Sequence, residues 1–116
     1  MGEKEFTLAK ELLELLPVEL KTSTETGNNP IKGVYCGDLL SWVMAKAQSG
    51  NVWITIQSHI NVIAVASLIG IPAIIIVEGS EIDDDVIKKA EEEEIAIFTT
   101  HKPAYEIASL CAGKGI

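Results

Sequence analysis

The stretch Asn51–Ser80, NVWITIQSHINVIAVASLIGIPAIIIVEGS, decides which fold this chain can adopt. Two apolar runs, VWITI and PAIIIV, have the length of buried strands, and the apolar segment INVIAVASLI between them has the length of a helix. A strand, a helix and a second strand in this order form one βαβ unit. The polar turn QSH joins the first strand to the helix, at the position where open α/β sheets usually bind ligands.

The segments on either side of this unit continue the alternation of strands and helices. The apolar strand runs are continuous rather than alternating, which is typical of strands buried on both faces of a parallel sheet. We therefore expect parallel strands near Val34, Trp53, Ile75 and Ile97, with helices on both faces of the sheet. The expected strands are 33–37, 51–56, 72–77 and 95–99, and the expected helices are 38–48, 60–69, 83–93 and 103–112, the first with Asp38 as its N-cap.

The N-terminal part of the chain has a different pattern. Leucines at helical spacing predict a helix from Thr7 to Leu16, which Pro17 ends. A short strand is expected at 18–22, and the turn-forming residues of 23–32 predict a loop. Because no linker or repeat divides the sequence, we expect residues 1–116 to form a single domain.

Composition and charge exclude several classes of partner. The chain has 116 residues and a net charge of −8, and its nine basic residues are all lysine. Without an arginine fork for phosphate or guanine, nucleic acid is not expected as a partner, and neither is an anionic membrane. Cys36 and Cys111 lie in apolar contexts and are expected to be buried free thiols. Polar residues interrupt the longest apolar stretch, so we expect a cytoplasmic protein without a membrane span.

The candidate site lies at the edge of the sheet where the parallel strands end. The turn residues that should line one pocket there are Ser58, His59, Asn61, Gly79, Ser80 and Thr100. Their hydroxyls and imidazole, together with helix N-termini, are suited to an anion. A purely structural interpretation also remains open, in which Ser58 and Asn61 cap a helix and His59 is a surface turn residue.

Known catalytic and cofactor motifs are missing from the sequence. The phosphate-binding GxxxxGK[ST], the dinucleotide-binding GxGxxG and the GxSxG of hydrolases are all absent, and no cysteine pair suggests a metal site. We therefore assign no catalytic residue, no metal ligand and no cofactor. One enzymatic alternative stays open, in which His59 and His101 act as acid–base groups.

Three segments of the chain together resemble a known family, the DRTGG domain. They are IKGVYCGDLL at 31–40, NVWITIQSHINVIAVASLIGIPAIIIVEGSEID at 51–83 and VIKKAEEEEIAIFTTHKPAYEIASL at 86–110. That domain is similar to the N-terminal domain of HPr kinase/phosphorylase, whose fold is shared with N-terminal domains of Mur ligases. The resemblance implies a three-layer α/β/α architecture with a mostly parallel sheet. It aligns the family's Asp-Arg pair with Ser58-His59 and its Thr-Gly-Gly with Glu78-Gly79-Ser80, where only Gly79 is kept.

The resemblance also implies a regulatory or accessory role. We expect a stand-alone, non-catalytic domain that binds a small ligand, such as a nucleotide or a phosphorylated metabolite, at the C-terminal strand edge. A protein-interaction module without a ligand is the main alternative. A homodimer is expected in either case, formed through the leucines of 7–16 or through the helix that carries Trp42 and Met44.

Overall fold

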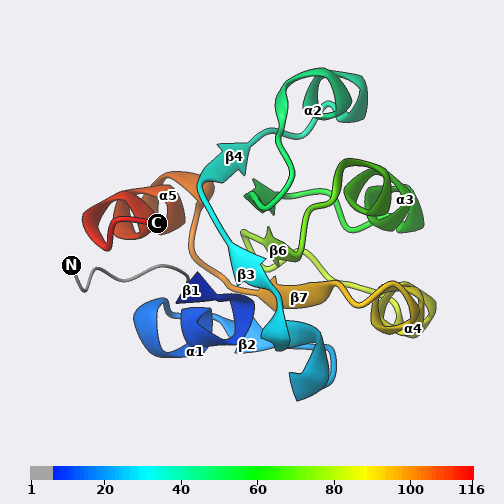
Figure 1. The fold of residues 1–116 in the computed structure, drawn as a ribbon, viewed down its shortest axis with the longest axis horizontal. Helices are drawn as coiled ribbons and strands as arrows, with labels where there is room; N and C mark the ends of the chain where they lie inside the picture. Colours follow the sequence, from blue (N-terminus) through cyan, green and yellow to red (C-terminus); the bar gives the residue numbers. More distant parts are fainter. Residues whose placement is uncertain (1–6) are drawn as a thin grey trace.

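The computed structural model describes residues 7–116 and is built around a five-stranded sheet with the strand order β2-β7-β6-β5-β4. Strands β4 to β7 are mutually parallel, and the short β2 pairs antiparallel with β7 (Figure 1). The prediction of a mostly parallel α/β sheet is confirmed. The strands are β2 (Glu19–Leu20), β4 (Val34–Cys36), β5 (Val52–Thr55), β6 (Ala73–Ile76) and β7 (Ala96–Thr99).

Helices cover both faces of this sheet and give three layers. One face carries α2 (Leu40–Lys46), α3 (Ile60–Ile69) and α4 (Asp84–Glu92), as the right side of Figure 1 shows. The other face carries α5 (Ala104–Gly113) and the N-terminal segment that contains α1 (Leu12–Leu15). The three crossovers between neighbouring parallel strands carry α2, α3 and α4 on one face, as expected when all have the same hand, and the segments before β4 and after β7 cover the other face.

Successive residues of the central strands enter two separate cores. Trp53, Ile74 and Ile97 pack with the helices α2, α3 and α4, whereas Ile54 and Ile75 pack on the side of α5 and α1. All five side chains are almost completely buried. Side chains alternate between the faces of a strand, so a strand with a core on each side must be apolar throughout. This is the physical reason for the continuous apolar runs in the sequence.

The N-terminal segment differs from its prediction. In place of one helix over 7–16 the chain forms β1 (Thr7–Leu8), a 3₁₀ turn η1 (Ala9–Glu11) and the short α1. Strand β1 pairs antiparallel with β3 (Pro30–Ile31), and this pairing withdraws Thr7 and Leu8 from the helix. The segment expected as a loop therefore contains a strand, and it also contains a 3₁₀ turn η2 (Thr24–Asn28).

Asp38 has another role than the predicted helix cap. Helix α2 begins at Leu40, and the carboxylate of Asp38 instead accepts hydrogen bonds from the Thr55 hydroxyl at 2.8 Å and the Ile56 backbone N–H at 2.9 Å. The Trp53 indole N–H donates to the Gly37 carbonyl at 2.8 Å. Together these hydrogen bonds attach residues 37–38, which lead from β4 to α2, to β5.

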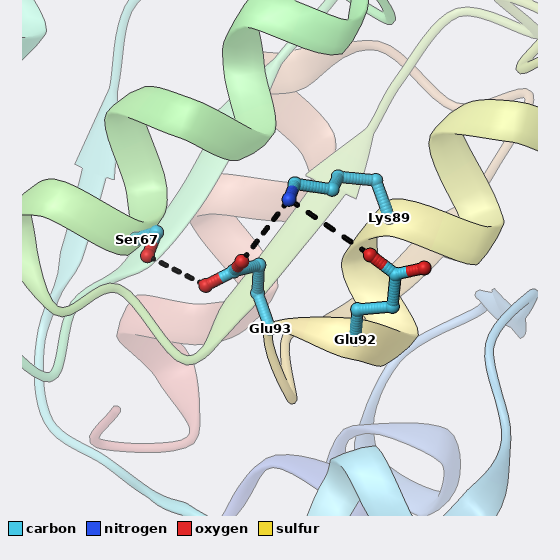
Figure 2. Close-up of polar contacts among 4 residues, drawn as sticks. All are labelled: Ser67, Lys89, Glu92 and Glu93. Atoms are coloured by element: carbon cyan, nitrogen blue, oxygen red, sulfur yellow. Dashed lines mark hydrogen bonds and ion pairs between the residues drawn. The ribbon is translucent and has the colours of Figure 1, made fainter.

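A polar network joins α3 to α4 on the outside of the molecule (Figure 2). The Glu93 carboxylate accepts a hydrogen bond from the Ser67 hydroxyl at 3.0 Å and pairs with the Lys89 ammonium at 3.3 Å, and Lys89 also reaches Glu92 at 3.8 Å. The hydrogen bond from Ser67, followed by the contacts with Lys89, lowers the pKa of Glu93. Since these groups are exposed, the network orients the two helices more than it stabilises them.

Both cysteines are free thiols, but only one of them is buried as predicted. Cys111 lies on the buried side of α5, and its burial, with a smaller contribution from the charge of Cys36, raises its pKa to about 11. Cys36 is exposed because it ends β4, one of the two edge strands of the sheet. Desolvation, followed by the charge of Asp38, raises the pKa of Cys36, so both groups are protonated at neutral pH.

Candidate functional site

The C-terminal edge of the parallel strands carries two adjoining hollows. The first hollow has a volume of about 680 Å³ and is formed by three separate segments of the chain. One segment precedes and includes β2, the second follows β6, and the third ends β7 and leads into α5. Its lining residues are Pro17, Val18, Glu19, Lys21, Gly79, Ser80, Glu81, Ile82, Thr99, Thr100, His101 and Lys102.

The turn after β6 gives the first hollow its shape. Glu78 and Gly79 both have left-handed backbone conformations, with φ values of 64° and 70°. The backbone N–H of Glu78 donates to the Lys102 carbonyl at 3.0 Å, and that of Gly79 donates to the Thr100 carbonyl at 2.9 Å. A Cβ atom on Gly79 would lie 2.8 Å from the His101 Nδ1 atom, so glycine allows the imidazole to lie directly against the turn.

Charged side chains of both signs surround the first hollow. Lys21 and Lys102 bring two ammonium groups, and His101 adds an imidazole. Among the acidic residues that line the hollow, Glu19 lies 3.9 Å from the Lys21 ammonium. The Lys102 ammonium lies 3.7 Å from Glu106, which is on the first turns of α5 and outside the hollow. Such exposed pairs are weak, so both lysines remain available to an anion.

The second hollow is smaller, about 350 Å³, and lies between the end of β5 and the start of α4. Its walls are partly apolar, and it is lined by Ile56, Gln57, Ser58, His59, Ile60, Asp83, Asp85 and Val86. Asp83 occupies the N-cap position of α4 but makes no side-chain capping bond. The two hollows meet where the Ser80 hydroxyl lies 3.4 Å from the Ser58 hydroxyl.

The residues predicted to line one pocket are divided between these hollows. Gly79, Ser80 and Thr100 line the first hollow, whereas Ser58 and His59 line the second. Asn61 is exposed in the first turn of α3 and lines neither of them. The N-cap of α3 is His59, and it makes no side-chain capping bond.

Thr100 has a structural role beside its position in the first hollow. The residue is only 7% exposed, and its hydroxyl donates to the Pro17 carbonyl at 2.9 Å and accepts from the Lys102 backbone N–H at 3.1 Å. Through these two hydrogen bonds, the Thr100 hydroxyl links the segment before β2 to the segment after β7.

Several lining residues were not predicted from the sequence. Lys21 reaches the first hollow because its backbone N–H donates to the Ile97 carbonyl at 2.8 Å, in line with the pairing of β2 with β7. A short strand at 18–22 was predicted, but no local sequence pattern indicates that it pairs with β7. Lys102 directly precedes the predicted helix 103–112, and Asp83 and Asp85 lie in the first turn of the predicted helix 83–93, so all three belong to connections at this edge of the sheet.

Residues 7–116 contain neither a metal-binding cluster nor a membrane-spanning helix. No group of three or more His, Cys, Asp or Glu side chains in this part of the chain is arranged to hold a metal ion. None of its helices is long and apolar enough to cross a membrane.

Comparison with known proteins identifies the family. Residues 11–112 match the model of the DRTGG domain, and the chain therefore belongs to the DRTGG domain family. Comparison with curated proteins gives no match. Among solved structures the chain is similar to the CBS and DRTGG domains of the regulatory region of Clostridium perfringens pyrophosphatase, a crystal structure in complex with the activator diadenosine tetraphosphate.

The similarity to that regulatory region concerns the fold. The TM-score is 0.68 at 16% sequence identity, and the match covers 95% of this chain. It covers 51% of the clostridial chain, so this chain spans about half the length of that structure.

Proposed function

We propose that this chain is a non-catalytic regulatory domain that binds a small phosphate-bearing ligand in the first hollow. The observation that supports this proposal most directly is that Lys21, which follows the antiparallel β2, and His101 and Lys102, which follow β7, line the same hollow of about 680 Å³. Ligand sites commonly have volumes of about 300–1,000 Å³ and lie at the C-terminal edge of α/β sheets.

The local backbone adds to the attraction for an anion. Helix α5 begins at Ala104, two residues after Lys102, and the unpaired N–H groups of a helix N-terminus favour negative charge. The carboxylates of Glu19 and Glu81 also line the hollow and repel an anion. The ligand must therefore displace Glu19 from Lys21. We accordingly expect moderate affinity that weakens with salt, as is suitable for a domain that senses a metabolite.

The similar structure supports a regulatory role of this kind. It is a regulatory region that contains a DRTGG domain, and it was crystallised with a nucleotide activator. The imidazoles of His59 and His101 line different hollows, so an acid–base pair forms no part of the proposal.

Isothermal titration calorimetry with inorganic phosphate, pyrophosphate and adenosine monophosphate tests the proposal. We expect Lys21→Gln and Lys102→Gln each to weaken binding by about fivefold to tenfold, since a lost charge-assisted contact removes about 1–1.5 kcal/mol. Lys88→Gln is the matched control, because Lys88 is an exposed lysine of α4 that lines neither hollow. The proposal fails if none of these compounds binds, or if all three variants bind equally well.

A second candidate function is self-association through α2. Trp42 is 58% exposed and Met44 47% exposed on this helix, and Leu39 just before it is 66% exposed. Large apolar side chains gathered on one short segment are typical of an interface. Leu12 and Leu16, by contrast, are buried in the core, which leaves α2 as the better of the two faces expected for a homodimer.

A further inference from the structure

We infer that the two hollows form one elongated site for a nucleotide, with the phosphate in the first hollow and an amino-bearing base in the second. This inference rests on the proposed function and adds to it the identity of the second part of the ligand and its direction of binding.

The two hollows share a wall. The segment from Gly79 to Val86 runs along both of them: its residues 79–82 line the first hollow, and Asp83, Asp85 and Val86 line the second. The hydroxyls of Ser80 and Ser58, one from each hollow, lie 3.4 Å apart at the junction. A ligand that occupies the first hollow therefore has the second hollow as its immediate neighbour.

The charges are separated along this edge. The ammonium groups of Lys21 and Lys102 belong to the first hollow, and the carboxylates of Asp83 and Asp85 belong to the second. Within residues 7–116 neither carboxylate forms an ion pair or a side-chain hydrogen bond, although Asp83 occupies a position where aspartate commonly caps a helix. Both are thus free to accept N–H donors from a ligand.

The walls of the second hollow are mostly polar, but they include apolar surface that a ring can contact. Ile56, Ile60 and Val86 provide apolar surface, and His59 adds an imidazole beside them. A phosphate in this hollow would be repelled by the two aspartates, and a purely cationic ligand would be repelled by the lysines of the first hollow. An amino-substituted heterocycle joined to a phosphate suits both hollows. Its phosphate pairs with the lysines of the first hollow, its amino N–H groups donate to the carboxylates of the second, and its ring contacts the apolar walls there.

A series of probes that differ in one group each tests this inference on the unmodified protein. We expect adenosine monophosphate to bind about tenfold more tightly than inosine monophosphate, which has a carbonyl oxygen in place of the amino group, since a hydrogen bond to a charged group is worth about 1.5 kcal/mol. Ribose 5-phosphate, which lacks the base, should bind at least tenfold more weakly than adenosine monophosphate because it leaves the second hollow empty.

The double variant Asp83→Asn/Asp85→Asn tests the role of the carboxylates. Asparagine can donate to the carbonyl of inosine monophosphate, so the preference for the amino group should disappear or reverse, a change that a purely structural role would not cause. Asp84→Asn is the matched control: it removes the same charge from the same helical turn, but Asp84 does not line the hollow. The control should keep the preference of about tenfold.

The results distinguish this inference from the proposed function. If ribose 5-phosphate and both nucleotides bind equally well, in a manner that depends on Lys21 and Lys102, the first hollow binds phosphate and the inference about the second hollow is overturned. It is also overturned if the preference for adenosine monophosphate survives in the double variant. If no phosphate compound binds at all, the proposed function is lost as well.

Discussion

At the level of single residues, Gly79 combines two constraints that other amino acids do not meet together. Its φ of 70° is left-handed, and its α-carbon faces the imidazole of His101. We expect Gly79→Ala to lower the free energy of unfolding by about 1–2 kcal/mol, because both the backbone and the contact become strained. Urea denaturation followed by circular dichroism measures this change.

Two further variants separate these effects. In a His101→Ala background the same substitution should cost less, because the clash with the imidazole is gone and only the backbone strain remains. Gly113→Ala is the control, since Gly113 is the last residue of α5 and a Cβ atom there has no neighbour within 4 Å. An equal loss of stability for Gly79→Ala in both backgrounds would show that the imidazole does not constrain the turn.

The residues of the site could be predicted only in part from the sequence. Gly79 and Ser80 follow a strongly apolar strand, so the end of that strand locates them in the sheet. Lys21 follows a strand of two residues, and its position depends on the antiparallel pairing with β7. Pairing between distant segments has no local pattern, and the division of the edge into two hollows depends on side-chain packing that periodicity does not describe.

At the level of elements, the connection from β4 to α2 is fastened to β5 by Asp38. Replacing it with alanine would leave the Thr55 hydroxyl, in a residue only 1% exposed, and the Ile56 N–H without their acceptor. We expect Asp38→Ala to lower the free energy of unfolding by about 1–3 kcal/mol. Thermal and urea unfolding provide the measurement.

Asp38→Asn is the matched comparison, because asparagine keeps an oxygen that can accept both hydrogen bonds. We expect Asp38→Asn to lower the free energy of unfolding by less than half as much as Asp38→Ala does. Equal stability of Asp38→Ala and the unmodified protein would mean that water replaces the carboxylate without loss, contrary to this expectation.

The central elements were predictable because local pattern and tertiary environment agree there. Helix α3 has the bounds expected from its apolar segment, Ile60–Ile69. The N-terminal segment is the opposite case, since the leucine spacing favours a helix but Thr7 and Leu8 pair with β3 instead. A two-residue pairing between segments about 20 positions apart is not encoded in either segment alone.

At the level of the whole molecule, the exposed side chains of α2 predict a concentration-dependent homodimer. Trp42→Ala should shift the equilibrium to the monomer of 12.5 kDa, because it removes the largest exposed apolar group of that helix. Multi-angle light scattering over a range of concentrations measures the mass. Tyr105→Ala is the control, since Tyr105 is 85% exposed and belongs to α5, the helix on the other face of the sheet.

A monomeric mass for the unmodified protein at every concentration would contradict the dimer. A dimer that Trp42→Ala leaves intact would place the interface elsewhere, and the same measurement on Leu13→Ala, a 41% exposed leucine of α1, would then test the N-terminal face.

One wall of the first hollow is formed by the shortest strand of the five-stranded sheet, β2. Strand β2 has two residues, and the segment before it is held by the bond from the Thr100 hydroxyl to the Pro17 carbonyl. An edge strand that contributes two residue pairs opens locally at a lower free energy than the parallel strands in the middle of the sheet. Local opening of this edge would therefore widen the hollow while β4 to β7 stay paired, and a ligand bound beside β2 would oppose it, so that binding should slow amide hydrogen exchange in β2.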